Sequence, residues 1–315
     1  MAAATPTVGW IGTGRMGYQL ALRLVKAGYD VAAYNRTRAK CEPLSAHGAK
    51  IVDRPADLAD RDIVVIMVSA DSDLESVISG EGGLLSGTGD CDVPKIVVDS
   101  STVSLESSAR IRAVVEACGA EFLAAPVSGN PKVIAAGKLT VAVSGPRAAF
   151  DAAEPLLAEF GRGVTYVGEG EAARLVKIAH NVFLGVVIQS LSEITVLAER
   201  GGVSRAAFLD FLNDSVLGST FTRYKTPALV NLDFHATFTN VLLRKDLQLG
   251  LSAGKELDVP MPLAAAADML VAQAIGAGYT EDDFATLVLE QARRSGYEIE
   301  SEDVPVDDGL APREA

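Results

Sequence analysis

The sequence has few of the residues that build disulfide or metal frameworks. Only three cysteines (Cys41, Cys91 and Cys118) and three histidines occur in 315 residues, and no two cysteines form a C-x-x-C pair. Scattered cysteines in odd number disfavour a disulfide framework, and histidines that do not cluster near them disfavour a structural zinc site. A chain of this length buries enough apolar surface to fold without such cross-links.

Positive charge is also scarce, with 28 lysines and arginines against 41 acidic residues and a net charge of -13. A surface this negative repels a phosphate backbone, so we expect no nucleic-acid partner. The N-terminus lacks the basic residues and apolar core of a signal peptide. The longest uncharged apolar stretch, within residues 178–192, is too short to span a bilayer. We therefore expect a cytoplasmic protein with no membrane partner.

What the first half does contain is an alternation of short apolar runs with helical patterns such as Met16–Ala27. This alternation is typical of a parallel sheet covered on both faces, and right-handed crossovers then give an α/β, Rossmann-like, doubly wound fold. Strands are expected at Val8–Ile11, Asp30–Tyr34, Ile63–Val68, Ile96–Asp99, Glu121–Ala124, Leu139–Val143 and Val164–Val167.

The pattern changes after Gly168, where Glu171–Arg200 predicts one long helix. We expect a Rossmann-like domain over residues 1–168 and an all-α domain over residues 169–297. The acidic residues 298–315 predict a disordered tail. Further helices are expected at Ser204–Asn213, Asn240–Glu256, Pro262–Ala277 and Glu281–Gly296, with Asn231–Phe238 as a loop.

A glycine motif stands where the first strand meets the first helix, in the segment Gly12-Thr13-Gly14-Arg15-Met16-Gly17. This is G-x-G-x-x-G, in which the three glycines serve the tight turn, the approach of a pyrophosphate and the packing of helix on strand. The helix N-terminus offers free N–H groups to phosphates. The glycine pattern alone is weak evidence, but its strand-to-helix context predicts dinucleotide binding.

The end of the second strand bears on the choice of cofactor. Enzymes that use NAD usually carry an acid there, whereas this chain has Asn35-Arg36-Thr37, followed by Arg38. A guanidinium suits a 2′-phosphate. The alternative is a solvated basic turn. We expect a preference for NADP(H), which leaves NAD(H) open as a second cofactor.

Lys177 and Asn181 are four residues apart on the long helix and so share a face. Their apolar neighbours Leu175, Val176, Ile178 and Val182 predict that much of this helix is buried. A lysine in such surroundings is costly unless it is paired or functional, and tuning could fit it for proton transfer. From spacing alone, a surface lysine with a buried stem is an equal alternative.

Three further segments combine small, polar or charged residues, and each has a plain alternative. Ser128-Gly129-Asn130 could hold a carboxylate or be an ordinary turn. Asp99–Thr102 ends a strand where ligands bind in open α/β sheets, or Ser101 or Thr102 only caps a helix. Lys245-Asp246 could be an exposed charge pair. His180 is expected to pack or to face solvent.

Five separated segments occur in the order found in one family, namely Gly12–Gly17, Asp99–Thr102, Ala125–Asn130, Lys177–Asn181 and Lys245-Asp246-Leu247. Together they resemble the β-hydroxyacid dehydrogenase family, of the 3-hydroxyisobutyrate dehydrogenase and tartronate semialdehyde reductase type. The resemblance covers roughly residues 7–296. It implies a Rossmann-like domain, a long interdomain helix and a helical domain that forms a homodimer or homotetramer. The substrate would be a small carboxylate-bearing alcohol or aldehyde.

The resemblance also implies roles. Lys177 would be the general acid of reduction and the general base of oxidation, and Asn181 and Ser128 complete the catalytic set. Ser128 and Gly129 would bind the substrate carboxylate, and Thr102 would lie near nicotinamide and substrate. The remaining implied residues are Phe238 for the substrate and Met67, Val68 and Lys245 for the cofactor.

Two departures bear on the substrate. Asn130 stands where the family commonly has a second glycine, which adds a polar side chain at the substrate pocket, and Val103 stands where a proline is usual. Two other functions stay open: imine reduction on the same architecture, and an NADP-binding sensor without turnover. The lysine at position 177 argues against both, because imine reductases usually lack it and a sensor needs no proton donor.

Overall fold

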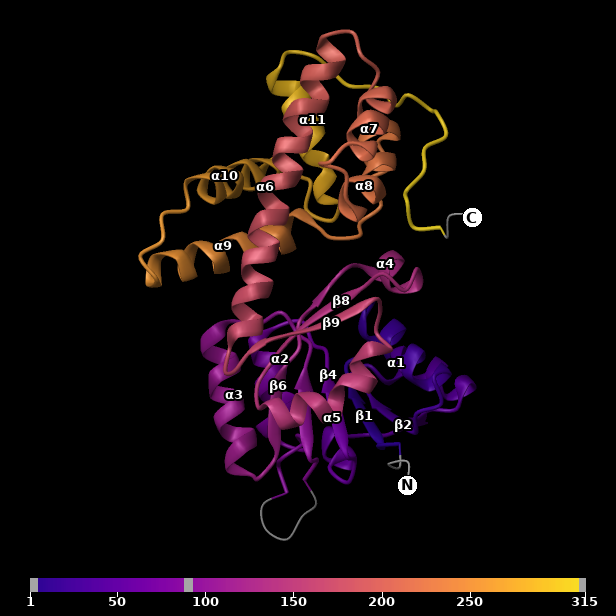
Figure 1. Cartoon of the computed structure of the whole chain (residues 1–315), viewed down its shortest axis with the longest axis vertical. Helices are drawn as coiled ribbons and strands as arrows, with labels where there is room; N and C mark the ends of the chain where they lie inside the picture. Colours follow the sequence, from indigo (N-terminus) through magenta and orange to yellow (C-terminus); the bar gives the residue numbers. More distant parts are fainter. Residues whose placement is uncertain (1–4, 88–92, 312–315) are drawn as a thin grey trace. The chain divides into compact units, whose positions relative to one another are not determined.

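The computed structural model describes residues 5–87 and 93–311, so that Cys91 lies outside the described residues. It contains two compact units, residues 1–177 and residues 178–315, seen in Figure 1. The division lies inside the long helix α6 (Ala172–Arg200) and not at residue 168. The reason is that the start of α6 packs with unit 1: Ala173 belongs to its core and Arg174 hydrogen-bonds to Asp99.

Unit 1 is built on a nine-stranded, mostly parallel sheet with the order β3-β2-β1-β4-β5-β6-β8-β7, and β9 pairs with β8. The central strands β1, β4 and β5 are buried along their whole length, as expected for strands covered on both faces. The strands are β1 (Val8–Ile11), β2 (Val31–Tyr34), β3 (Lys50–Ile51), β4 (Ile63–Ile66), β5 (Ile96–Asp99), β6 (Glu121–Ala124), β7 (Val127–Ser128), β8 (Thr140–Ser144) and β9 (Gly163–Gly168).

The expected α/β class is confirmed, with one departure from an all-parallel sheet. Strand β8 runs antiparallel to β6 and β7. Residues 129–139, which join β7 to β8, are too few for a crossover that covers the sheet. The helical elements of this unit are α1 (Gly17–Lys26), η1 (Arg38–Lys40), η2 (Glu42–His47), η3 (Pro55–Leu58), α2 (Asp71–Ser79), α3 (Leu105–Ala117), α4 (Pro131–Ala135) and α5 (Arg147–Ala158).

Unit 2 is helical, as expected, and includes one helix that the sequence did not predict. That helix is α8 (Thr220–Asn231), which begins at the capping box of Ser219 and Thr222 and carries Pro227 inside it. The other elements are α7 (Arg205–Asp214), α9 (Asn240–Glu256), α10 (Pro262–Gly276), η4 (Phe284–Thr286) and α11 (Leu287–Arg294).

Helices α6 and α9 approach closely because glycines stand at their contact. A Cβ atom on Gly250 of α9 would lie 2.0 Å from Val182 Cγ2 of α6, and one on Gly185 of α6 would lie 2.9 Å from Leu247 Cδ2. Only hydrogen atoms fit there. This contact fixes the part of α6 that carries Asn181 against the part of α9 that carries Asp246.

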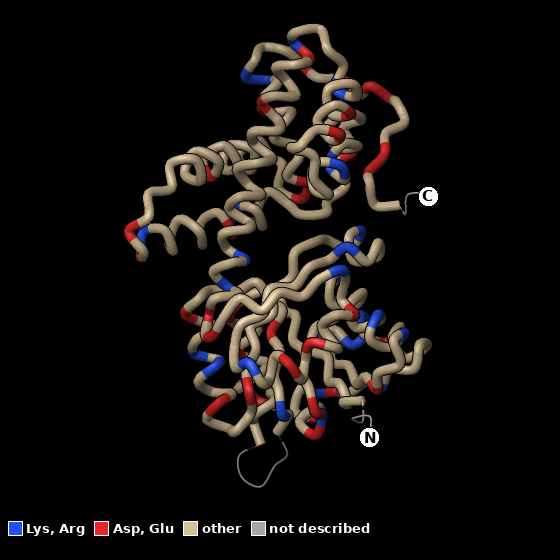
Figure 2. The backbone as a smooth tube through the Cα atoms, viewed as in Figure 1, with Lys and Arg blue, Asp and Glu red and all other residues tan. Residues whose placement is uncertain are grey.

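The acidic segment 298–311 is ordered, so the expected disorder there is wrong for these residues. Glu302 accepts hydrogen bonds from the Arg205 and Ala206 N–H groups at the start of α7. Asn231 exchanges two hydrogen bonds with the backbone of Val304. Composition indicated disorder, but Glu302 finds positive partners in buried Arg205 and the N-terminus of α7, and Arg205 also donates to the Glu300 carbonyl. Figure 2 shows the acidic residues along this extended segment.

Helix α6 is, among the described residues, the one helix whose length and hydropathy would suffice to cross a membrane. Half of the relevant window is buried inside the protein, and buried core helices meet the same criterion. The uncharged apolar stretch within residues 178–192 is only a part of this helix.

Candidate cofactor and catalytic site

The glycine turn between β1 and α1 has the shape that a pyrophosphate requires. Gly12 has φ +97°, and a Cβ on it would lie 2.2 Å from the Met67 carbonyl oxygen, while one on Gly17 would lie 2.1 Å from that of Gly12. A Cβ on Gly14 would meet nothing within 4 Å. Helix α1 has no acid in its first turn, and its N-cap residue Met16 makes no side-chain cap. Free space and uncapped N–H groups therefore coincide at Gly14.

A second observation supports the fit of a dinucleotide at this turn. The buried hydroxyl of Thr13 has no hydrogen-bond partner within the described part of the chain, so a phosphate oxygen could satisfy it. The Thr13 N–H donates to Asn35 Oδ1 over 2.8 Å, and Asn35 Nδ2 donates to the Thr37 carbonyl over 2.9 Å. The amide of Asn35 therefore ties the glycine turn to the end of β2.

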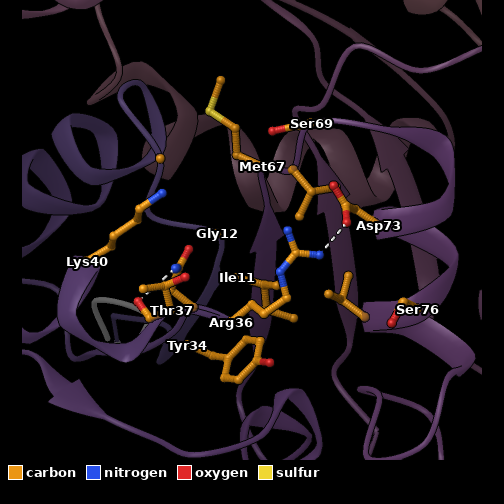
Figure 3. A pocket seen from close by; sticks show the side chains of 14 residues that line it. Ile11, Gly12, Tyr34, Arg36, Thr37, Lys40, Met67, Ser69, Asp73 and Ser76 are labelled. Carbon is orange, nitrogen blue, oxygen red and sulfur yellow. Dashed lines mark hydrogen bonds and ion pairs between the residues drawn. The ribbon is translucent and has the colours of Figure 1, made fainter.

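A pocket of about 180 Å³ extends from this turn to α2 and is drawn in Figure 3. Seven of the thirteen predicted cofactor residues line it, together with Lys40, Asp73 and Ser76. The lining residues are Ile11, Gly12, Gly14, Tyr34, Asn35, Arg36, Thr37, Lys40, Met67, Val68, Ser69, Asp73, Ser76 and Val77. The lining therefore brings together part of the predicted set, from the glycine turn, the end of β2 and the end of β4.

The charges around this pocket are more mixed than the sequence indicated. Arg36 is mostly exposed and pairs with Asp73 over 2.9 Å. In the view of Figure 3, Arg36 lies between Lys40 and Asp73. Arg38 is an ion-pair partner of Asp53 and is not among the lining residues. The cations of the pocket are therefore Arg36 and Lys40.

The ends of β4 and β5 are joined beside the pocket. The Val68 N–H donates to Ser101 Oγ over 2.9 Å, and the Ser101 N–H donates to Asp99 Oδ1 over 3.0 Å. Thr102, the next residue, is half-buried. Ser101 therefore binds the β4 loop and does not cap a helix; Ser104 caps α3 by accepting from the Ser107 N–H.

Arg174 anchors the start of α6 to the end of β5, three residues before Lys177. Its guanidinium donates to Asp99 Oδ2 and to the Ser101 carbonyl, each over 2.5 Å, and to Ser108 Oγ over 3.1 Å. Arg174 and Asp99 are 1% and 0% exposed. This buried network fixes the first turns of the helix, and Lys177 itself is half-buried.

The apolar neighbours of Lys177 are buried only in part. Leu175 and Val176 are 39% and 42% exposed, whereas Ile178 and Val182 are buried. The burial expected around Lys177 is therefore found at two of its four apolar neighbours. Four apolar residues close together in sequence do not show which of them face the core. The helical periodicity places Leu175 and Val176 on the side that faces away from it.

The segment Ser128-Gly129-Asn130 joins β7 to α4. Ser128 is half-buried and Gly129 is exposed with φ +148°. Asn130 is 6% exposed, and its Oδ1 accepts the Val133 N–H over 3.0 Å as the cap of α4. The amide of Asn130, which we expected at the substrate pocket, therefore uses its oxygen to cap a helix. Its buried Nδ2 has no hydrogen-bond partner in the described structure.

Asn181 is held from two sides. Its Nδ2 donates to Asp246 Oδ2 over 2.5 Å, and His180 Nδ1 lies 2.9 Å from its Oδ1. Asn181 and Asp246 are 4% and 3% exposed, and Lys245 Nζ lies 3.8 Å from the Asp246 carboxylate. Asp246 therefore orients the amide that we expect to bind substrate. His180 is exposed, as expected.

Phe238 lies in a loop that a buried ion pair organises. Lys225 and Asp283, each 2% exposed, are 2.6 Å apart, and Asp283 also accepts the N–H and hydroxyl of Thr237. Phe238 packs edge-on against Phe284. Burial raises the pKa of the Asp283 carboxyl, but the charge and hydrogen bond of Lys225 outweigh it, so that its pKa lies below the usual range.

Sequence reasoning missed five residues of these arrangements. For Arg174 a signal existed, because it precedes Lys177 and Asn181 at helical spacing in an apolar stretch. Lys40 and Asp73 belong to no motif, and Asp283 is far from Lys225 in the sequence. Asp246 was treated as half of a charge pair. Among the described residues, no group of three His, Cys, Asp or Glu side chains is placed to hold a metal ion.

Two family models match the chain, one over each of its parts. Residues 7–168 match the family model described as the NAD binding domain of 6-phosphogluconate dehydrogenase. Residues 170–290 match the model described as NAD-binding of NADP-dependent 3-hydroxyisobutyrate dehydrogenase. The two matched ranges correspond to the sheet-containing part and to most of the helical part of the chain.

Individual relatives match over nearly their whole length. Glyoxylate/succinic semialdehyde reductase 1 of Arabidopsis thaliana is 31% identical over 283 residues, which are 89% of this chain and 96% of the relative. The crystal structure of 3-hydroxyisobutyrate dehydrogenase from Salmonella typhimurium matches with a TM-score of 0.79 and 28% identity, covering 90% and 98% of the two chains. Psf3, in a complex with NADP+ and 2-OPP, matches with a TM-score of 0.78 and 25% identity over 90% of this chain and 99% of Psf3. The chain therefore belongs to the β-hydroxyacid dehydrogenase family, NAD(P)-binding oxidoreductases of the 3-hydroxyisobutyrate dehydrogenase type that act on hydroxyl groups.

Proposed function

We propose that this chain is an NADP(H)-preferring dehydrogenase or reductase that interconverts a small carboxylate-bearing alcohol and the corresponding aldehyde. The observation that carries the cofactor preference is the end of β2. No acid stands there, Asn35 is engaged with the glycine turn, and Arg36 and Lys40 supply positive charge to the pocket. When bound, the dinucleotide would supply the hydride that reduces the carbonyl carbon.

Lys177 handles the proton on the substrate oxygen in this proposal. In reduction its ammonium group donates a proton to the developing alkoxide, and in oxidation the neutral amine removes the proton from the hydroxyl. The anchor at Arg174 supports this role, because it fixes the helical turn that precedes Lys177. A general acid must be held within hydrogen-bond reach of its target, and a fixed helix achieves that without ordering a loop.

The substrate carboxylate is bound by the Ser128 hydroxyl and by the backbone around Gly129. Asn181, whose amide Asp246 orients, is a second polar ligand of the substrate. Thr102, Phe238 and Lys245 take the substrate and cofactor roles that the family resemblance implies. Asn130 contributes to specificity through its buried Nδ2, which has no hydrogen-bond partner among the described residues.

The first test follows the absorbance of NADPH and of NADH with tartronate, methylmalonate and succinic semialdehydes and with glyoxylate. Faster oxidation of NADPH by at least one of them is the expected result. Oxidation of neither cofactor by any of the four would contradict the proposed substrate class. Faster oxidation of NADH would contradict the cofactor preference.

The second test concerns the proton donor. Lys177→Ala should lose at least about a hundredfold in kcat, the contribution typical of general acid–base catalysis. Its Kd for NADPH should stay within about threefold, since the pyrophosphate and adenosine contacts are unchanged. Lys255→Ala, an exposed lysine on α9, is the control and should keep full activity. An equal loss of turnover and NADPH binding in Lys177→Ala would mean that the lysine is structural.

Two other activities give distinct results in the same assays. An imine reductase would oxidise NADPH with cyclic imines and not with the four aldehydes. A sensor would bind NADPH tightly and turn over nothing. Lys177 argues against both, because neither activity needs a lysine there.

We further propose that the chain acts in the cytoplasm as a homodimer or homotetramer, without nucleic-acid or membrane partners. Exposed apolar side chains on α9 and α10, such as Val241, Leu263 and Met269, support contacts with a second copy. Light scattering coupled to size-exclusion chromatography tests this, and a monomeric mass at micromolar concentration would contradict it.

A further inference from the structure

The ion pair between Arg36 and Asp73 places an acid inside the pocket that we assign to the adenosine end of the cofactor. Arg36 lies two residues after the end of β2, Asp73 lies in the first turn of α2, and 36 residues separate them in the sequence. Arg36 Nη1 lies 2.9 Å from Asp73 Oδ1, and both residues line the pocket. The Arg36 side chain is 83% exposed. An ion pair this exposed contributes little to stability, so the fold does not explain it.

We propose that Asp73 sets the cofactor selectivity of this chain, as the counter-ion that a 2′-phosphate must displace from Arg36. This inference rests on the proposed use of NADP(H). With a 2′-hydroxyl, Arg36 keeps its carboxylate partner, because the cofactor brings no charge at the 2′ position. With a 2′-phosphate, Arg36 exchanges one anion for another, and the displaced carboxylate stays close to the phosphate. Asp73 therefore weakens NADP(H) binding and leaves NAD(H) binding almost unchanged.

The other groups around the pocket support this direction. Lys40 is the second cation of the lining, so that two positive charges face one carboxylate. Asp73 is one of two acids in the first turn of α2, where the helix dipole favours negative charge. Neutralising it would remove the repulsion and also free Arg36 and this helix end for a phosphate. Each effect increases the affinity for a 2′-phosphate and none requires a change in the NADH contacts.

Asp73→Asn is the direct variant, because asparagine keeps the shape of the side chain and removes only its charge. Glu75→Gln is the matched control. Glu75 lies two residues further along the same helix, pairs with Arg110 Nη2 over 2.5 Å, and does not line the pocket. It removes the same charge from the same helix without changing the pocket.

The experiment measures the Kd of NADPH and of NADH by fluorescence titration for the whole chain and both variants, at low and at high salt. We expect Asp73→Asn to bind NADPH about three- to tenfold more tightly than the unchanged chain, with NADH within about twofold. The gain should shrink at high salt, because the repulsion is between exposed charges. Glu75→Gln should leave the ratio of the two affinities within about twofold.

An unchanged ratio in Asp73→Asn, or the same change in Glu75→Gln, would overturn the proposal. Weaker NADPH binding in Asp73→Asn would also overturn it, because Asp73 would then hold Arg36 in place for the phosphate. The unchanged chain tests the proposed function separately. If the unchanged chain binds NADH more tightly than NADPH, the proposed cofactor preference is wrong. The effect of Asp73 is still measured by how Asp73→Asn changes the ratio of the Kd for NADPH to the Kd for NADH.

Discussion

Replacing Arg174 by methionine is expected to destabilise unit 1 by about 3–5 kcal/mol, the cost typical of removing one partner of a buried ion pair. The Asp99 carboxylate is fully buried and would keep the Ser101 N–H as its donor. The Ser101 carbonyl and the Ser108 hydroxyl would each lose a donor as well. The magnitude therefore reflects an uncompensated buried charge and not only lost hydrogen bonds.

Urea unfolding followed by tryptophan fluorescence reports the loss of stability of unit 1 specifically. The chain has a single tryptophan, Trp10, which is buried in β1 of unit 1. Arg110→Met is the control, since Arg110 pairs with Glu75 and Glu106 on the surface and its loss should cost at most about 1 kcal/mol.

A double-mutant cycle separates the pair from the rest of the network. Arg174→Met combined with Asp99→Asn removes both charges, so the two single losses should exceed the combined loss by about 2 kcal/mol or more. A cost for Arg174→Met no larger than that of Arg110→Met, or strictly additive losses, would refute the reasoning.

Three further predictions concern unit 2 and the substrate segment. Because the pKa of Asp283 is lowered in the folded chain, its ionised form stabilises the fold above the unfolded pKa of about 3.9, and this contribution is lost as the pH falls through the folded pKa. Urea midpoints followed by circular dichroism should therefore fall below about pH 4, and fall less steeply in Asp283→Asn; equal slopes would contradict this. Gly250→Ala should destabilise the chain by about 1–3 kcal/mol, because its Cβ would lie 2.0 Å from a valine carbon, whereas Gly276→Ala, with nothing within 4 Å, should be neutral or stabilising in the same assay. Asn130→Asp keeps an oxygen that can cap α4 but buries a charge, so it should lower stability, and it should raise KM for carboxylate substrates at least about threefold through like-charge repulsion. An unchanged KM would place Asn130 outside the substrate site.

Elements with clear periodicity could be predicted almost to the residue. Strands β1, β5 and β6 and helix α9 have the bounds that the sequence indicated. Helix α8 was missed because Pro227 and several threonines conceal its pattern. Its cap at Ser219 and the packing of its apolar side chains in unit 2 override that weak local propensity.

The site could be predicted as far as motifs reach along the chain. The glycine turn, Arg36, Met67 and Val68 do line one pocket. The side chains that orient or oppose them come from other segments: Asp73 for Arg36, Asp99 for Arg174 and Asp246 for Asn181. Composition and spacing contain no signal for such pairs, because the partners meet only when the sheet and the helices have formed.

The segment 298–311 has a consequence for the order in which the chain can fold during synthesis. The sheet of unit 1 is complete once Gly168 has been made, and Arg174 follows within a few residues. Unit 2 depends on Glu302 for two N–H groups of α7 and on Val304 for Asn231. On the ribosome, the N-terminal unit can therefore reach its native structure while the helical unit still waits for residues that have not been translated.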